Sequence, residues 1–201
     1  MKKILFIIVV ATLGTLNLDA QKFVPGVLFG MVTSQVDGDK LEGYDKPGIE
    51  AGIFVKNNFK TYWSFSMSLN YIQKGSRKLL NPDIPGDRYY YLRLNYVEVP
   101  FMLGVTVKKK YLAEAGFAFG YLFRAREDVD GIGFLDPDPP FKSYDFPIKY
   151  GLGYKINEKL ILTFHHAYSI IPIRNHPGNQ TWYFDRGQYN NYLILSLNLQ
   201  L

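Results

Sequence analysis

Apolar and polar residues alternate one by one through most of this chain, and that period of two restricts its fold more than any other feature. Residues 62–74 carry a large apolar side chain at every second position, with mostly serine or asparagine between them. The apolar set is Trp63, Phe65, Met67, Leu69 and Tyr71. A helix would scatter both sets around its circumference, whereas a strand places them on opposite faces. Residues 193–201, with leucine at every odd position, repeat the pattern, so the sequence predicts an all-β protein.

Six further segments complete a set of eight predicted strands. Four of them show the alternation throughout, namely residues 49–56, 113–123, 145–156 and 160–169. The first strand is placed within residues 24–35 and the fourth within residues 89–107. In the fourth, the apolar face passes from even-numbered positions up to Tyr96 to odd-numbered positions from Val97 onward. A slip of one residue is what a β-bulge produces, and Pro100 suits such an irregularity because it cannot donate a ladder hydrogen bond.

The connections between these segments alternate in length. The short ones are 57–60, 108–110 and 157–159, and the long ones are 36–47, 75–88, 124–144 and 172–188. Outer-membrane barrels have short periplasmic turns and longer extracellular loops, and tilted strands of roughly 9–11 residues are enough to cross the bilayer. The sequence therefore predicts an eight-stranded, antiparallel, up-and-down transmembrane β-barrel in the cell outer membrane.

The first twenty residues resemble an export signal. Lys2 and Lys3 precede ten mostly apolar residues, 4–13, and the small residue Ala20 precedes Gln21. That apolar stretch is too short to span a bilayer as a helix, which needs about 20 residues. We therefore expect residues 1–20 to be a signal peptide and residues 21–201 to form the barrel domain.

Composition and charge exclude several classes of function. The chain has no cysteine, which excludes disulfide frameworks, thiolate zinc sites, iron–sulfur clusters and cysteine nucleophiles. The formal net charge is +5, but apart from the run 108–110 the basic residues are scattered along the sequence. A nucleic-acid-binding protein gathers its basic residues on one face, so we expect no nucleic-acid partner.

The two faces of the predicted strands differ in chemistry, which indicates the face that meets lipid. Aromatic residues near the strand ends of the apolar face match the interfacial girdles of membrane barrels. They are Trp63, Tyr71, Tyr96, Tyr121, Tyr150, Tyr154 and Tyr168. The polar face would line a lumen that is narrow enough to be filled by side chains, and because unpaired buried charge is costly we expect a neutralised polar network there. Its predicted members are Glu50, Lys56, Arg93, Glu98, Glu114, Lys149 and His165.

Two short motifs and several strand glycines carry a resemblance to a known family. The motifs are Tyr71-Ile72-Gln73-Lys74-Gly75 and Leu94-Asn95-Tyr96-Val97-Glu98-Val99-Pro100, and the glycines are Gly116, Gly120, Gly151 and Gly153. With these residues the chain resembles the PorT-like outer-membrane β-barrel domain family of Bacteroidetes along the whole of residues 21–201. The resemblance implies the barrel fold and the outer-membrane location. Because the namesake of the family serves a gliding and secretion system, it also raises the hypothesis of a link to secretion machinery.

Few residues suggest catalysis or metal binding. His165 and Ser169 share a face, but at positions i and i+4 of a strand they lie about 13 Å apart, which is beyond hydrogen-bond reach. The third long loop contains four aspartates, Asp128, Asp130, Asp136 and Asp138. Their spacing matches no EF-hand, and the nearby prolines indicate an extended loop rather than a Ca²⁺ site. We therefore expect no catalytic, cofactor-binding or metal-binding residues, and no enzymatic activity.

The function expected from the sequence is that of an integral membrane protein serving envelope structure or partner binding. Its partners would be outer-membrane lipid and a protein that binds the extracellular loops, because loops on a rigid scaffold commonly carry specificity. The loops 75–88 and 124–144 offer the best surface, with aromatic contacts from Tyr89, Tyr90, Phe134 and Phe141. A membrane-embedded lipid-modifying enzyme and a narrow channel are the alternatives, and the uniformly apolar outer face leaves the oligomeric state open.

Overall fold

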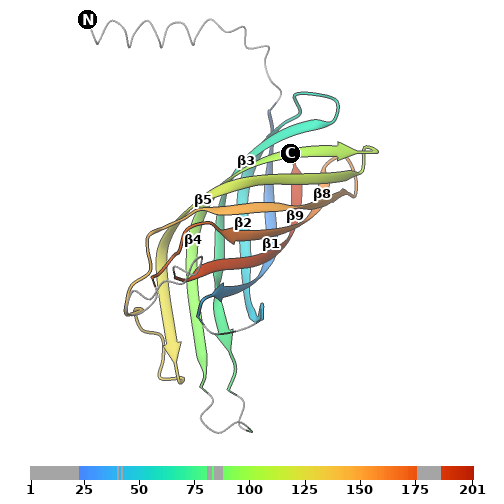
Figure 1. Cartoon of the computed structure of the whole chain (residues 1–201). Coiled ribbons are helices and arrows are strands. Elements are labelled where there is room, and N and C mark those ends of the chain that lie inside the picture. The colour runs from blue at the N-terminus through green and yellow to red at the C-terminus, as the bar shows by residue number, and fades with distance from the viewer. Residues whose placement is uncertain (1–22, 40, 42, 81–82, 84–87, 176–186) are drawn as a thin grey trace, which may run out of the picture.

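Nine strands account for nearly all the regular structure of the described residues (Figure 1). The computed structural model describes residues 23–39, 41, 43–80, 83, 88–175 and 187–201, so the predicted signal peptide lies outside the described residues. The strands are β1 (Phe23–Asp37), β2 (Lys46–Asn57), β3 (Trp63–Lys78), β4 (Tyr90–Val107), β5 (Tyr111–Val129), β6 (Tyr144–Asp145), β7 (Pro147–Lys155), β8 (Leu160–Ser169) and β9 (Tyr189–Gln200). The described residues contain no helix long and apolar enough to cross a membrane.

The strands close into a ring of eight. Each neighbouring pair is antiparallel, and β1 pairs with both β2 and β9 while β4 pairs with β5. The two-residue strand β6 and the longer β7 both pair with β5 and are separated only by Phe146, so together they form one position in the ring. The predicted all-β, eight-stranded, up-and-down fold is therefore confirmed.

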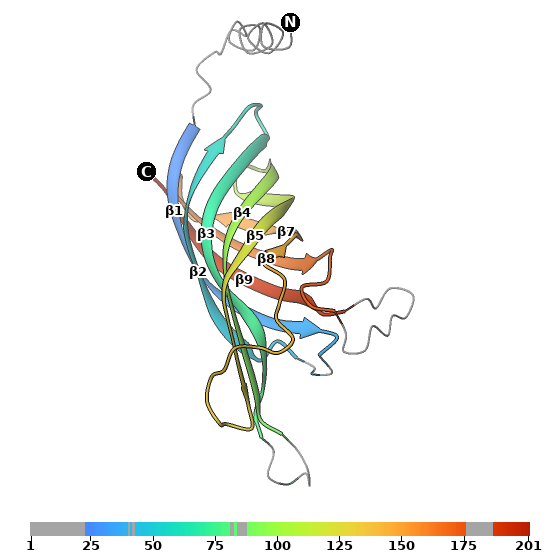
Figure 2. The ribbon, with the colours of Figure 1, turned by 90° about the vertical axis from the view of Figure 1, so that its left-hand side faces the viewer.

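The two ends of the barrel differ in the length of their connections (Figures 1 and 2). Three short turns lie at the end that also holds the start of β1 and the end of β9. At the opposite end, hereafter the long-loop end, β3, β4 and β5 continue beyond the rest of the ring as a three-stranded sheet. β3 reaches Lys78 and β5 reaches Val129, so parts of the predicted loops 75–88 and 124–144 are strand. We call this sheet the β3–β5 extension.

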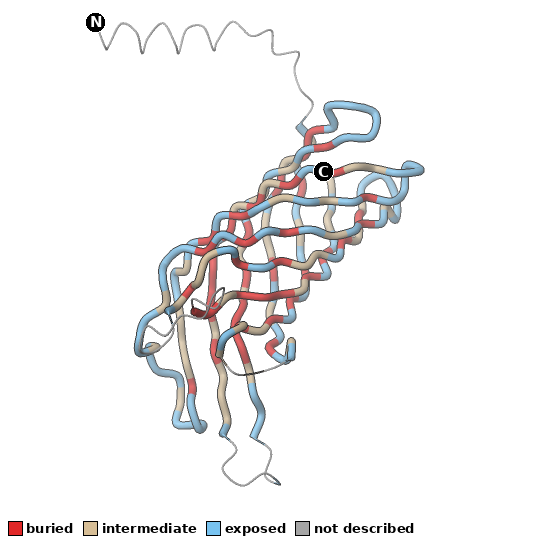
Figure 3. The backbone as a smooth tube through the Cα atoms, viewed as in Figure 1, coloured by how far each residue is buried: buried red, intermediate tan, exposed pale blue. Residues whose placement is uncertain are grey.

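Burial alternates along each strand, as the barrel geometry requires (Figure 3). In β9, for example, Leu195, Leu197 and Leu199 are exposed while Ile194 and Ser196 are buried. The exposed large side chains are mainly aliphatic and aromatic, whereas the inward positions hold many serine, asparagine and charged residues. The polar set therefore points into the barrel, and the apolar set points out of it.

The predicted phase slip in β4 is wrong. Leu92, Leu94, Tyr96 and Glu98 are all buried, so the even-numbered positions point inward without interruption. The irregularity lies in the neighbouring strand instead, because Asn95 and Tyr96 pair with residues 124 and 122 of β5 and leave one extra residue between them. Consequently Tyr96 does not belong to an outer aromatic girdle.

An apolar cluster fills the lumen toward the long-loop end, which explains that error. We call it the apolar plug, and its buried members are Val32, Val36, Ile72, Leu92, Leu94, Tyr96, Ala167, Ile173, Tyr192 and Ile194. Phe141 from the connection between β5 and β6 packs against it. Ile173 belongs to the connection between β8 and β9, and its carbonyl oxygen accepts a hydrogen bond of 2.7 Å from the Lys142 backbone N–H. Two loops thus help to cover this end of the lumen.

Gly75 allows β3 and β4 to approach closely where the extension begins. Its φ is +138°, and a Cβ built on it would lie 2.1 Å from the carbonyl oxygen of Leu92. Only glycine adopts such a backbone conformation without strain. This requirement gives a physical reason for a glycine at the end of the 71–75 motif.

We expect Gly75→Ala to lower the free energy of unfolding by about 3 kcal/mol, because backbone strain and a steric clash with Leu92 act together. Gly131→Ala is the matched control, since Gly131 also has a positive φ (+71°) but a Cβ added to it would have no atom within 4 Å. The control should cost about 1 kcal/mol. Urea unfolding in detergent measures both values, and equal losses would contradict the steric explanation.

Candidate functional site

A fully buried lysine lies at the centre of the lumen. The Lys74 ammonium forms ion pairs with Glu98 and with Asp145, the latter at 3.0 Å, and all three side chains are completely shielded from solvent. The rings of Tyr96 and Tyr192 lie 4.5 and 4.2 Å from the same nitrogen, close enough for cation–π attraction. The charge is therefore surrounded by two carboxylates and two aromatic faces.

Neighbouring polar groups donate hydrogen bonds to one oxygen of each carboxylate, whereas Glu98 Oε2 and Asp145 Oδ1 are buried without a hydrogen-bond donor among the described residues. The Tyr192 hydroxyl donates to Glu98 at 2.8 Å, and the Asn190 side-chain amide donates to Asp145, also at 2.8 Å. Lys149 lies 3.6 Å from the second oxygen of Glu98. These contacts join β3, β4, β6, β7 and β9, so the buried charges connect strands on several sides of the ring.

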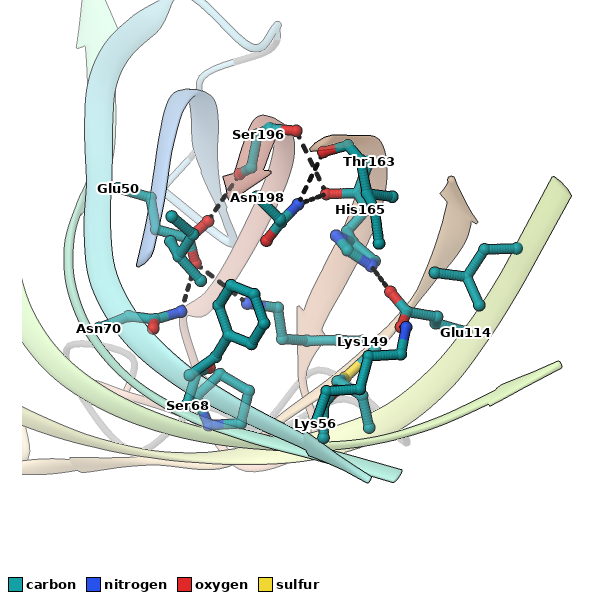
Figure 4. Close-up of a pocket in the computed structure, with 17 residues that line it drawn as sticks. Glu50, Lys56, Ser68, Asn70, Glu114, Lys149, Thr163, His165, Ser196 and Asn198 are labelled. Carbon is teal, nitrogen blue, oxygen red and sulfur yellow. Dashed lines mark hydrogen bonds and ion pairs between the residues drawn. The ribbon is translucent and has the colours of Figure 1, made fainter. Parts of the chain in front are cut away.

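Glu50 forms a second layer of the lumen (Figure 4). Its carboxylate accepts hydrogen bonds from Asn70 at 2.8 Å and from Ser196 at 2.9 Å, and it lies 3.5 Å from Lys149. Lys149 therefore bridges Glu50 and Glu98. A buried carboxylate needs several donors to offset its lost hydration, and Asn70 and Ser196 supply two hydrogen bonds here.

Glu114 forms a third layer nearer the short-turn end. His165 Nε2 lies 3.2 Å from one of its oxygens, and Lys56 Nζ lies 3.8 Å from the other (Figure 4). A cavity of about 70 Å³ separates this layer from Glu50 and is lined by both groups. A water molecule occupies about 30 Å³ of liquid, so the cavity has room for only a few waters.

The three layers together form the lumen network. It comprises Glu50, Lys56, Lys74, Glu98, Glu114, Asp145, Lys149 and His165. Four carboxylates face three ammonium groups, and His165 is a fourth group able to carry positive charge. The arrangement holds charges of both signs against one another, and Glu50, Glu114 and their basic partners also line the small cavity just described.

Six of the seven residues predicted for this network point into the lumen, and Arg93 does not. Because β4 has no phase slip, Arg93 lies on the outer face, where its guanidinium carbon is 5.6 Å from the ring centroid of Tyr91 and 4.9 Å from that of Phe134. Sequence reasoning missed Lys74 and Asp145. The alternation in the sequence could have placed both inside the barrel. Lys74 is at an even-numbered position of β3, like the polar residues before it, and Asp145 is at an odd-numbered position, like the inward-facing Lys149.

The side chains considered for catalysis take separate structural roles. His165 contacts Glu114, whereas the Ser169 hydroxyl accepts a 3.1 Å hydrogen bond from the Asn190 backbone N–H. His166 points the other way and lies 2.8 Å from both the Tyr150 hydroxyl and the Asn191 side-chain oxygen. Within the described ranges no group of three or more histidine, cysteine or acidic side chains could hold a metal ion.

A second cavity, of about 430 Å³, lies at the long-loop end. Arg174 lines it and contacts Glu127 at 3.4 Å, Gln188 at 2.7 Å and the Phe141 ring at 4.1 Å from the centroid. Asp39, in the connection between β1 and β2, also lines it. Burial raises the pKa of the Asp39 carboxyl above its usual value, although a hydrogen bond from the Leu41 backbone N–H opposes the shift.

Comparison with known proteins gives the family. The family model described as outer membrane protein beta-barrel domain matches residues 20–175. The chain belongs to this family. The outer membrane is therefore its location, and the apolar outer face of the barrel is the surface that meets lipid. No curated protein matches the chain.

The chain is similar to several solved structures at low sequence identity. Neisserial surface protein A is 10% identical, with 88% of this chain and 97% of that chain covered and a TM-score of 0.53. Ail of Yersinia pestis, in complex with the heparin analogue sucrose octasulfate, is 11% identical, with 89% and 99% covered and a TM-score of 0.49. OprG from Pseudomonas aeruginosa is 10% identical, with 89% and 95% covered and a TM-score of 0.40. Of the three, the neisserial protein supports the barrel fold, and the fold alone.

Removing the central cation should destabilise the barrel strongly. We expect Lys74→Met to lower the free energy of unfolding by about 3–5 kcal/mol, because Glu98 and Asp145 would remain buried without their shared counter-charge. The measurement is urea unfolding in detergent, followed by tryptophan fluorescence.

Two further variants test whether the loss of stability comes from the unpaired buried carboxylates. Lys159→Met removes an exposed lysine from the short turn between β7 and β8 and should be nearly neutral. The triple variant Lys74→Met/Glu98→Gln/Asp145→Asn removes the unpaired charges and should recover much of the loss. If Lys74→Met behaves like Lys159→Met, the buried ion pairs do not stabilise the barrel.

Proposed function

We propose that this protein is a non-enzymatic outer-membrane barrel that binds a protein partner on the cell exterior through the tip of the β3–β5 extension. The carrying observation is a group of exposed apolar side chains at that tip. They are Leu79, Leu80, Ile132 and Leu135, with exposed fractions of 60%, 54%, 74% and 58%. Apolar groups that gather outside the lipid belt mark interaction surfaces.

The length of the strands supports the exterior position of this tip. β5 has 19 residues and β4 has 18, roughly twice the 9–11 residues that a tilted strand needs to cross. The surplus lies at the long-loop end, and long loops in this class of barrel are extracellular. Ile132 and Leu135 follow the end of β5, and a backbone bridge between Glu127 and Leu135 fastens their loop to the sheet.

The filled lumen supports a binding role over transport or catalysis. The lumen network and the apolar plug occupy the interior, Ile173 joins the plug from one loop, and Phe141 packs against it from another. His165 and Ser169, the pair with the chemistry of a hydrolase, have different hydrogen-bond partners. The side chains that could react are thus engaged in holding the barrel together.

The PorT-like assignment and its link to secretion belong to this proposal as well. In their favour, the two motifs behind the resemblance meet in space, because Gln73 pairs with Asn95 and Lys74 with Leu94 across β3 and β4. The buried ion pair between Lys74 and Glu98 joins one motif to the other. The tip of the extension would then be the surface presented to a component of such machinery.

Photocrosslinking in intact cells tests the binding surface. A photoreactive amino acid at Ile132 or Leu135 should give a discrete crosslinked product with a second protein. The same amino acid at the exposed Asp138 of the same connection is the control and should give none. Ile132→Ser/Leu135→Ser should abolish the association but keep the heat-dependent mobility of the folded barrel on SDS gels. Absence of a product at both positions would overturn the proposal.

Conductance measurements test the closed interior. We expect the purified protein to add no stepwise conductance to a planar lipid bilayer, because charged and apolar side chains fill its lumen. Reproducible steps that disappear when the sample is heat-denatured would favour the narrow-channel alternative.

A further inference from the structure

Four arginines share the outer face of the β3–β5 extension. Arg93 points outward, as its inward neighbours Leu92 and Leu94 require, and directly paired residues of adjacent strands point to the same side. Arg93 pairs with Arg126, and Asn95 pairs with Arg124. Arg77 pairs with Tyr91, which is the outward-facing residue of β4 next to Arg93. We call Arg77, Arg93, Arg124 and Arg126 the arginine face.

The protein itself neutralises this positive charge only in part. Arg93 and Arg126 lie directly opposite each other, an arrangement that destabilises a sheet when the charges are alike. Arg126 forms an ion pair of 2.6 Å with Asp136, whose side chain is 84% exposed. Among the described residues, Arg77 and Arg124 have no carboxylate within 4.0 Å. The face therefore keeps an excess of positive charge, on one exposed arginine (Arg124) and three half-buried ones.

The arginine face begins where the aromatic girdle ends. Tyr71 and Phe123 lie side by side, with ring centroids 6.0 Å apart, and Tyr121 contacts Tyr144 at 5.7 Å. Arg124 follows Phe123 directly in the chain. Aromatic girdles mark the boundary of the hydrocarbon region, and a strand advances about 3.3 Å per residue. The arginines therefore stand at the level of the lipid headgroups.

We propose that the arginine face binds the phosphate groups of a phosphorylated glycolipid in the outer leaflet. Guanidinium groups bind phosphate through paired, charge-assisted hydrogen bonds. Gln73 is half-buried on the same face and donates to the Tyr71 hydroxyl, so its side-chain amide lies close to the arginines. The exposed Asp136 can exchange its ion pair with Arg126 for a lipid phosphate. A lipid is favoured over an acidic protein because the face continues directly from the lipid-facing girdle. The inference rests on the exterior position of the long-loop end.

The test compares lipid binding by three forms of the full-length protein purified in detergent. They are the wild type, Arg124→Gln/Arg126→Gln and the control Lys108→Gln/Lys110→Gln, which removes the same charge from the turn between β4 and β5 at the opposite end. Each must keep its heat-dependent mobility on SDS gels. Native mass spectrometry measures the retention of bisphosphorylated lipid A, with dephosphorylated lipid A as the comparison. Inorganic phosphate and a polyglutamate peptide are tested as competitors.

We expect the dissociation constant for bisphosphorylated lipid A to rise roughly thirtyfold in Arg124→Gln/Arg126→Gln, since each basic side chain near an anionic surface contributes a factor of about five. The control should match the wild type, and dephosphorylated lipid A should bind all three forms weakly and equally. Equal binding of bisphosphorylated lipid A by all three forms, or an equal loss in the control, overturns the inference.

The two competitors test whether the arginine face binds a ligand other than lipid. Full competition by inorganic phosphate would reassign the face to small anions, and full competition by the peptide would reassign it to an acidic protein. Either result overturns the lipid assignment. None of these measurements involves Ile132 or Leu135, so failure here is distinguishable from failure of the proposed partner surface.

Discussion

The barrel depends on the stabilisation of one buried positive charge. An ammonium group removed from water loses several kcal/mol of hydration free energy, and only well-placed opposite charges and hydrogen bonds offset that loss. For Lys74 the offset comes from Glu98 on the adjacent strand, from Asp145 across 71 residues of sequence, and from two tyrosine rings. The contact with Glu98 joins neighbouring strands, whereas those with Asp145 and Tyr192 join strands that are far apart in the sequence. This ammonium therefore favours the correct arrangement of distant strands as well as their stability.

Around that charge the interior changes character along the barrel axis. The layers of Glu50 and Glu114 lie toward the short turns and enclose a small polar cavity, whereas the apolar plug lies toward the long loops and excludes water from Lys74. Exclusion of water strengthens the electrostatic attraction within the network. The outer end is then completed by Arg174, which links loop residues to the rim of the sheet. The apolar plug and the polar layers thus stabilise one another.

Most of this architecture could be predicted from the sequence, and the errors share one cause. Alternation and connection lengths predict eight strands, their order, the two ends and six members of the network. The rule that apolar residues face lipid then fails at Leu92, Leu94 and Tyr96, because the lumen is itself apolar at that level. The same rule consequently places Arg93 inside and assigns the bulge to β4 instead of β5. No local pattern reveals the plug, since Ile173 and Phe141 reach it from loops whose course depends on the closed barrel.

The unequal lengths of the strands give the protein a front and a back. β3, β4 and β5 rise well beyond the rim, while β7 and β8, with 9 and 10 residues, end close to it (Figure 2). A barrel with an oblique rim is not equivalent in all directions around its axis. The orientation of the barrel about the membrane normal therefore decides which neighbouring proteins meet the β3–β5 extension. Any assembly that contains this protein must fix that rotation.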